Sequence, residues 1–317
     1  MATDTRRRNA LMACAALVVG ALTLTACGGS ATADGAGRQS KVQQSKAQLA
    51  LTADSVTTKT AQAGTASNTA AGVDYVAMGS SFAAGPSIPP LQSSSGAAAC
   101  SRSANNYASI VARDIGANLT DVTCSGATTA NILTTNQGSQ PPQINAVNSG
   151  TDLVTITIGG NDVNYLGSMV TYSCQNSGGT NCGTVDQGAI NTALGTVGQK
   201  IENVVNAVKA RAPQARILLV SYSTLLPDTG GCTGVPLTAD QRIFERTVAT
   251  RLAQAYIDTA NRTGATLVRF ATASHGHDAC AADPWVEKYK PASGRTTYHP
   301  NEAGMKAAAS LVKSALG

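Results

Sequence analysis

Two serines stand in a turn that directly follows the apolar run beginning at Val73. The run from Val73 to Met78 is apolar or strand-favouring, and Gly79-Ser80-Ser81 ends it. A polar loop is the simplest interpretation of such a turn. A hydroxyl at the end of a buried strand is also what a nucleophilic serine requires, provided that a base lies beside it.

Three later loops carry further residue types that acyl transfer uses. Histidine is an ordinary general base, an amide donates hydrogen bonds without carrying a charge, and glycine lets a substrate approach the backbone. Each residue alone is typical of a loop, but together with a serine they could hydrolyse an ester. The residues are Gly126, Asn161 and His299.

Short apolar runs alternate with segments of helical periodicity, which predicts crossover connections and a parallel sheet with helices on both faces. We expect a three-layer α/β/α domain over residues 73–317 with about five strands. Ligands bind at the carboxyl ends of such strands, so the serine, glycine, asparagine and histidine should converge at one edge. The runs span 73–78, 119–123, 153–158, 217–221 and 267–270, and the helical segments about 104–115, 187–211, 238–263 and 301–316.

The four polar segments resemble, in order, the sequence blocks of the SGNH hydrolases, also called GDSL esterases and lipases. The resemblance covers essentially all of residues 73–317 and is strongest to secreted, disulfide-containing bacterial lipases and phospholipases. It implies a flavodoxin-like fold and the hydrolysis of carboxylic acyl esters without a cofactor. The matching blocks are Gly79-Ser80-Ser81, Ser125-Gly126-Ala127-Thr128, Gly159-Gly160-Asn161-Asp162 and His299-Pro300-Asn301.

The resemblance also implies a role for each matched residue. Ser81 would be the nucleophile, with Ser80 as the alternative, and His299 would be its base. The oxyanion would be stabilised by the backbone N–H groups of Ser81 and Gly126 and by the side-chain amide of Asn161. The chain lacks the Gly-x-Ser-x-Gly elbow of the unrelated α/β-hydrolases, because alanine follows Phe82 where that motif has glycine.

Two positions depart from the family pattern. Ser80 stands where the family usually has aspartate, and Thr296 stands where it usually has the aspartate that orients the histidine. Some lipases of the family are thought to use a backbone carbonyl there. The resemblance therefore predicts that the Thr296 carbonyl holds His299, with the Asp283 carboxylate as the alternative.

Cysteine usage indicates an oxidising compartment and no zinc site. No close Cys-x-x-Cys pair exists among the eight cysteines. Spacing alone leaves many pairings open. The expected topology places the segments of each pair side by side at the active edge, and predicts Cys100–Cys124, Cys174–Cys182 and Cys232–Cys280.

Two further features have modest interpretations. His275, His277 and Asp278 could ligate a metal, but loop histidines beside a cysteine are more often structural, so we expect no metal site. Trp285, the only tryptophan, either lines an acyl pocket or simply packs in the core.

The N-terminal residues predict export. Arg6-Arg7-Arg8 precedes an apolar run that is too short to span a membrane stably, and residues 1–26 read as a signal peptide of the lipoprotein type. Cys27 is the predicted lipidation site, and residues 27–72 form an Ala/Thr/Ser/Gln-rich tether that cannot bury a core. Ordinary secretion is the alternative.

These features together predict an exported serine lipase or esterase, anchored to the cell envelope through Cys27, that acts as a monomer on lipid or other acyl esters. The net charge of +5 includes the leader arginines. Outside the leader the sequence has no basic cluster, so we expect no nucleic-acid partner. A polysaccharide deacetylase with the same residues and a catalytically silent ligand-binding lipoprotein are the alternatives.

Overall fold

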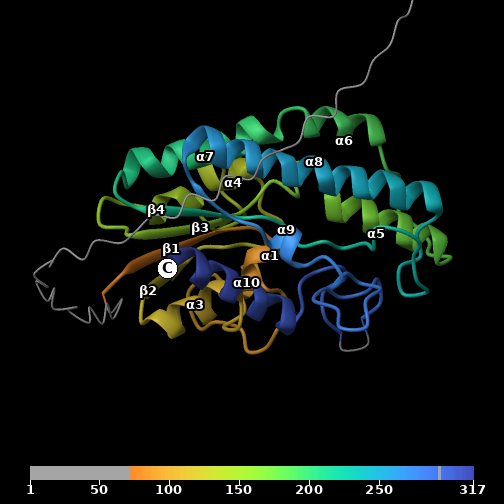
Figure 1. Ribbon diagram of the computed structural model, residues 1–317, viewed down its shortest axis with the longest axis horizontal. Helices are drawn as coiled ribbons and strands as arrows, with labels where there is room; N and C mark the ends of the chain where they lie inside the picture. Colours follow the sequence, from red (N-terminus) through yellow and green to blue (C-terminus); the bar gives the residue numbers. More distant parts are fainter. Residues whose placement is uncertain (1–71, 292–293) are drawn as a thin grey trace, which may run out of the picture. The chain divides into compact units, whose positions relative to one another are not determined.

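Five strands form one parallel sheet in the order β2-β1-β3-β4-β5 (Figure 1). This computed structural model describes residues 72–291 and 294–317, so the predicted signal peptide, Cys27 and the tether up to residue 71 lie outside the described residues. Each strand overlaps one of the predicted apolar runs over at least half of that run. The strands are β1 (Asp74–Gly79), β2 (Asn118–Asp121), β3 (Leu153–Thr157), β4 (Arg216–Val220) and β5 (Thr266–Val268).

The strand order creates a crevice beside β1. The chain passes from β1 to β2 on one side and then returns to place β3 on the other side of β1. Such a reversal of direction is where open α/β sheets bind their ligands. Gly79 pairs with Thr157, the last residues of β1 and β3, so the loops that follow these two strands leave the sheet at the same level.

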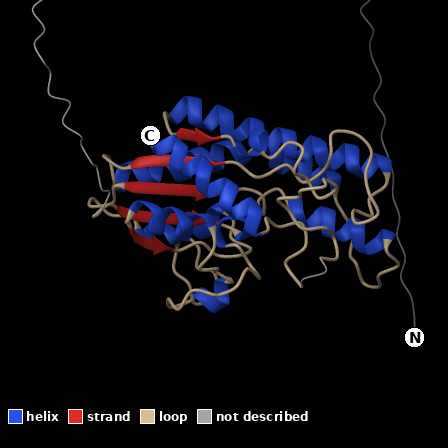
Figure 2. Ribbon diagram, turned by 60° about the horizontal axis from the view of Figure 1, so that its bottom comes forward, coloured by secondary structure: helices blue, strands red, loops and turns tan. Residues whose placement is uncertain are grey.

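Helices cover both faces of the sheet, which confirms the expected three-layer α/β/α fold (Figures 1 and 2). On one face lie α3 (Tyr107–Ile115) and α10 (Glu302–Leu316), and on the other α4 (Thr129–Leu133), α7 (Val197–Arg211) and α8 (Ala239–Thr263).

Strand β1 contributes to the cores on both faces. Tyr75 and Ala77 pack with the side chains of α3 and α10, whereas Val76 and Met78 belong to the larger core formed with α7 and α8. This alternation follows from the period of two along a strand. Burial on both faces fixes the position of the turn at its carboxyl end.

One predicted helix is wrong in its extent, and several short helices were not predicted. The segment 187–211 divides into α6 (Gln187–Leu194) and α7. The N–H of Gly195 donates a hydrogen bond to the Thr192 carbonyl at 3.0 Å, and this tighter turn ends α6. Thr196 then begins the next helix. The elements not described above are α1 (Ser81–Ala84), α2 (Ala97–Cys100), the 3-10 helix η1 (Gln143–Ala146), α5 (Tyr165–Asn176), α6 (Gln187–Leu194) and α9 (Phe270–Ala273).

The disulfides crosslink the loops and short helices rather than the sheet. The bonded pairs are Cys100–Cys124, Cys174–Cys182 and Cys232–Cys280, as the topology predicted. Among residues 72–291 and 294–317, no helix combines the length and apolar character that crossing a membrane requires.

Candidate active site

The nucleophile turn begins where β1 ends. Gly79 has φ of 145°, and a Cβ at this position would lie 2.4 Å from the Thr157 carbonyl oxygen, so only glycine fits. Ser80 is the N-cap of the short helix α1, and Ser81 is its first residue. The first N–H groups of a helix have no acceptor within it, so this turn leaves the Ser81 N–H free to bind a substrate oxygen.

The side chains of Ser81 and His299 are in direct contact. Ser81 Oγ lies 2.7 Å from His299 Nε2, although the two residues are 218 positions apart in the sequence. Ser80, by contrast, is 1% exposed, and its hydroxyl lies 3.1 Å from the Tyr222 hydroxyl. The hydroxyl that faces the base is therefore that of Ser81.

The other ring nitrogen of His299 faces a backbone carbonyl, but not the one that was predicted. Its Nδ1 lies 2.7 Å from the Thr297 carbonyl oxygen, whereas the Thr296 carbonyl accepts the backbone N–H of His299 at 3.2 Å. The residue between, Tyr298, has φ of 56°. This left-handed conformation turns the Thr297 carbonyl back toward the imidazole, so the predicted contact with Thr296 is wrong.

The alternative partner, Asp283, lies against a different histidine. Its carbonyl oxygen is 2.7 Å from Nδ1 of His277, and its carboxylate is 78% exposed. No carboxylate of the described residues takes the place of an aspartate beside His299 within hydrogen-bonding distance. Ser81 and His299 therefore form a pair in which the imidazole faces a backbone carbonyl and no carboxylate.

Loss of solvent around the partly buried His299 favours its neutral imidazole. Loss of solvent lowers the pKa of His299 to about 4, and the hydrogen bond with the Thr297 carbonyl opposes this shift only in part. The ring of Phe82 lies against it, with ring centroids 5.1 Å apart. A neutral imidazole at neutral pH can accept a proton from the Ser81 hydroxyl.

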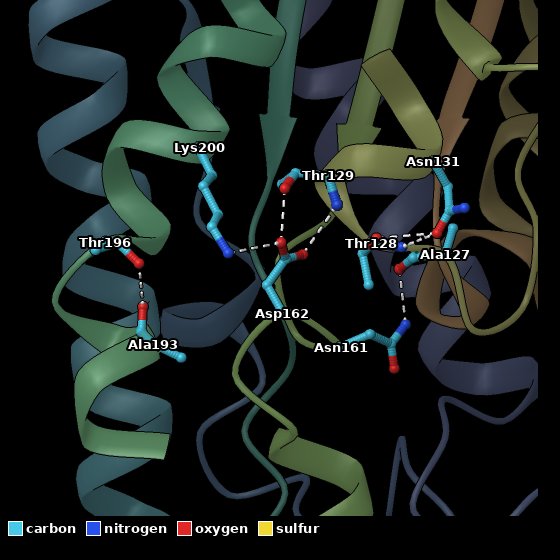
Figure 3. A network of polar contacts seen from close by, with 9 residues as sticks. All are labelled: Ala127, Thr128, Thr129, Asn131, Asn161, Asp162, Ala193, Thr196 and Lys200. Carbon is cyan, nitrogen blue, oxygen red and sulfur yellow. Dashed lines mark hydrogen bonds and ion pairs between the residues drawn. The ribbon is translucent and has the colours of Figure 1, made fainter. Parts of the chain in front are cut away.

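The two remaining predicted donors lie in the loops after β2 and β3. The Asn161 side-chain amide donates one hydrogen bond to the Ala127 carbonyl at 2.8 Å, which leaves its second N–H available (Figure 3). Gly126 has φ of 85° and is exposed. In the described part of the chain, no hydrogen-bond acceptor contacts its backbone N–H.

Direct hydrogen bonds join the loop of Gly126 to the turn before Ser81 and the loop of Asn161 to the loop of Gly126. The N–H of Cys124 donates to the Gly79 carbonyl at 3.0 Å, and Asn161 contacts the residue after Gly126 as described. The structure thus brings Ser81, His299 and the loops of Gly126 and Asn161 to one edge of the sheet.

Asp162 connects the loop of Asn161 to the start of α4. Its carboxylate accepts the N–H of Thr129 at 2.9 Å and the hydroxyl of Thr129 at 2.6 Å, and it lies 3.6 Å from the Lys200 ammonium (Figure 3). Thr129 is the first residue of α4. The carboxylate therefore also satisfies an unpaired N–H at the start of that helix.

Sequence reasoning missed two side chains that support the turn. Gln143 of η1 accepts the Gly79 N–H at 2.7 Å and donates to the Gly79 carbonyl at 3.0 Å. Tyr222, in the loop after β4, contacts both Ser80 and the N–H of Gly160. Neither residue stands in a motif, and their sequence positions do not reveal these long-range contacts.

The residues considered for a metal site have structural partners. His277 stacks on Trp285 with centroids 3.9 Å apart, and the Asp278 carboxylate accepts the N–H of Cys280 at 2.8 Å. His275 lies 3.6 Å from Asp228. In the described ranges, no group of three or more histidine, cysteine or acidic side chains is arranged to hold a metal ion. Trp285 also stacks on Phe270, so packing accounts for its position.

Sequence comparison identifies relatives of this chain. The model of the GDSL-like Lipase/Acylhydrolase family matches residues 77–307. Lipase 2 of Streptomyces coelicolor is 34% identical over 262 residues, which are 77% of this chain and 86% of that protein. A lipase of Streptomyces rimosus is 31% identical over 232 residues, covering 73% of this chain and 82% of that protein.

Solved structures show the same arrangement of the chain. An extracellular lipase from Streptomyces rimosus superposes with a TM-score of 0.63 at 29% identity, over 77% of this chain and 99% of that one. Phospholipase A1 from Streptomyces albidoflavus gives a TM-score of 0.64 at 28% identity, over 77% of this chain and 98% of that one. The chain therefore belongs to the GDSL-like lipase/acylhydrolase family, the SGNH hydrolases, and is a carboxylic ester hydrolase.

Proposed function

We propose that this protein is an exported lipase or esterase that cleaves acyl esters through a covalent intermediate on Ser81. The contact of 2.7 Å between Ser81 Oγ and His299 Nε2 carries the proposal. The relatives named lipase and phospholipase A1 favour a lipid ester as the substrate. The leader residues favour export, and Cys27 favours an anchor in the membrane.

In the first half of the reaction, Ser81 Oγ attacks the ester carbonyl carbon while His299 Nε2 takes the hydroxyl proton. The Thr297 carbonyl accepts the Nδ1–H and holds the ring in the tautomer whose Nε2 is free. The carbonyl oxygen becomes an oxyanion, which the N–H groups of Ser81 and Gly126 and the amide of Asn161 stabilise. The carbon–oxygen bond to the alcohol then breaks, and the alcohol leaves with the proton from His299.

In the second half, water replaces the alcohol. His299 takes a proton from the water as its oxygen attacks the acyl carbon of the ester on Ser81, and the proton passes to Ser81 Oγ as the acid leaves. The Thr297 carbonyl orients the imidazolium but carries no full negative charge. It stabilises the transient cation less than a buried carboxylate would.

A series of chromogenic esters of increasing acyl length tests the proposal. We expect the purified protein to cleave medium or long acyl esters, and we expect Ser81→Ala and His299→Ala to lose turnover by on the order of 10³-fold or more. Turnover of acetate esters alone would indicate the deacetylase instead. A folded wild-type protein that cleaves no ester would indicate a silent binder and would refute the proposal.

A further inference from the structure

A buried tyrosine hydroxyl connects two of the three loops that supply the proposed oxyanion donors, those of Ser81 and Asn161. Tyr222 is 6% exposed, and its hydroxyl lies 3.1 Å from Ser80 Oγ and accepts the N–H of Gly160 at 2.9 Å. Ser80 precedes Ser81, and Gly160 precedes Asn161. One hydroxyl thus contacts the immediate neighbours of the nucleophile and of the amide donor.

Close approach shows that this contact is specific. A Cβ at Gly160 would lie 2.7 Å from the Tyr222 hydroxyl oxygen, so glycine is required for the backbone to come this near. The Tyr222 ring also packs on Phe82 with centroids 4.7 Å apart, and Phe82 in turn packs on His299. Tyr222 is therefore linked to the turn of Ser81, to the loop of Asn161 and, through Phe82, to His299.

Packing alone does not fix the Tyr222 side chain. Tyr222 also lines a cavity of about 350 Å³, together with Leu225 and Leu252, so close packing does not enclose it on all sides. Hydrogen bonds at the hydroxyl supply the missing constraint. Burial raises the pKa of Tyr222 to about 12, which keeps the hydroxyl protonated over the whole working range of an esterase.

We propose that Tyr222 is a positioning residue that holds the Ser81 N–H and the Asn161 amide at a fixed separation. Oxyanion donors act only when their geometry is held within about 0.5 Å. Here two of the donors belong to separate loops, after β1 and after β3, and the Tyr222 hydroxyl is a bridge between them. The proposal rests on the proposed ester hydrolysis at Ser81.

Removal of the hydroxyl alone tests this role. Tyr222→Phe keeps the ring and its packing on Phe82, and we expect kcat to fall by about tenfold or more while KM changes by less than about threefold. The matched control is Tyr75→Phe, which also loses one fully buried hydroxyl, bonded to Thr155 at 2.7 Å within the sheet. We expect this control to lose thermal stability but to keep its kcat.

A double-mutant cycle gives a second readout. Ser80→Ala removes the partner hydroxyl, and we expect its loss of kcat and that of Tyr222→Phe to be less than additive in free energy, because both break one connection. A kcat for Tyr222→Phe within about twofold of the wild type, or an equal loss in Tyr75→Phe, would overturn the inference. The proposed function would fail separately, through unchanged turnover in Ser81→Ala.

Discussion

The proposed base, His299, has a backbone carbonyl as its partner and no carboxylate, and that difference should be visible in the pH dependence of the activity. Burial lowers the pKa of His299 to about 4, and only the Thr297 carbonyl acts against it. The proton acceptor is the neutral ring, so activity should be lost as pH falls through that pKa. We expect kcat/KM, which reports the free enzyme, to hold through pH 6 and to fall only near pH 4–5.

Two substitutions distinguish the carbonyl from a carboxylate partner. Thr296→Ala and Asp283→Ala leave the Thr297 backbone unchanged, so both should keep most of the turnover and the same acid limb, measured with a chromogenic ester from pH 4 to 8. An acid limb near pH 6.5, the ordinary value for histidine, would contradict the lowering of the His299 pKa by burial. Loss of turnover in a folded Asp283→Ala variant would instead indicate that the Asp283 carboxylate is the partner of His299.

Residue types in motifs could be predicted, whereas backbone acceptors could not. Ser81, Gly126, Asn161 and His299 stand in recognisable blocks, and the fold brings their loops to one edge. The carbonyl that orients His299 belongs to any residue type, so the sequence does not distinguish one position from its neighbour. The left-handed φ of the buried Tyr298 determines that the Thr297 carbonyl, and not its neighbour, faces the imidazole.

At the scale of elements, a buried carboxyl lies where α8 packs against α5. Glu245 of α8 is fully buried, and neither of its oxygens has a hydrogen-bond partner among the described residues. The nearby Ser168 hydroxyl donates to the Tyr165 carbonyl at 2.9 Å. Burial raises the pKa of Glu245 to about 8. The carboxyl is therefore protonated in the folded protein at neutral pH.

The contribution of Glu245 to the stability of the packing between α5 and α8 should therefore decrease as pH rises from about 4.5 to 8. The folded protein binds the Glu245 proton more tightly than the unfolded chain, whose glutamate titrates near 4.5, so this stabilisation is complete below pH 4.5 and is lost as pH rises toward 8. We expect the free energy of unfolding to fall by up to about 1.4 kcal/mol per pH unit across that window.

Chemical denaturation at several pH values measures the effect of Glu245. Glu245→Gln cannot titrate, so its stability should vary less with pH than that of the wild type. Glu202→Gln is the control, because Glu202 is paired with Arg262 at the surface, 2.6 Å away. Equal pH slopes in the wild type and in Glu245→Gln would contradict the assignment.

The layers and the parallel sheet follow from apolar runs that alternate with helical segments, but the helix α5 could not be predicted in this way. Its sequence mixes Tyr165, Met169 and Tyr172 with serines and a glycine, and its apolar periodicity is weak. It forms because these side chains join the large core and Cys174 is bonded to Cys182. Contacts from distant segments stabilise a helix that local sequence barely favours.

For the molecule as a whole, the disulfides should differ in their contribution to stability. Cys232–Cys280 closes a segment of 48 residues and Cys174–Cys182 one of 8. A crosslink removes more freedom from the unfolded chain when it closes a longer loop, so paired Cys→Ser replacement should cost about 1.5 kcal/mol more at the longer loop. Urea unfolding of the two variants measures the difference, and an equal cost would refute the entropic explanation.

The lipid anchor proposed at Cys27, which lies outside the described residues, predicts where the enzyme is found in the cell. An apolar leader that ends in Leu24-Thr25-Ala26-Cys27 favours cleavage before the cysteine and attachment of a diacylglyceryl group. Two acyl chains suffice for stable anchoring, whereas one gives only reversible binding. Cys27→Ala should therefore release the protein from the membrane fraction while its kcat stays unchanged, because the predicted site lies in the domain after the predicted tether.

Ser30→Ala, three residues later, is the control and should stay with the membranes. Immunoblotting of fractionated cells together with an ester assay measures both properties. A wild-type protein found wholly in the soluble fraction would replace the anchor with ordinary secretion.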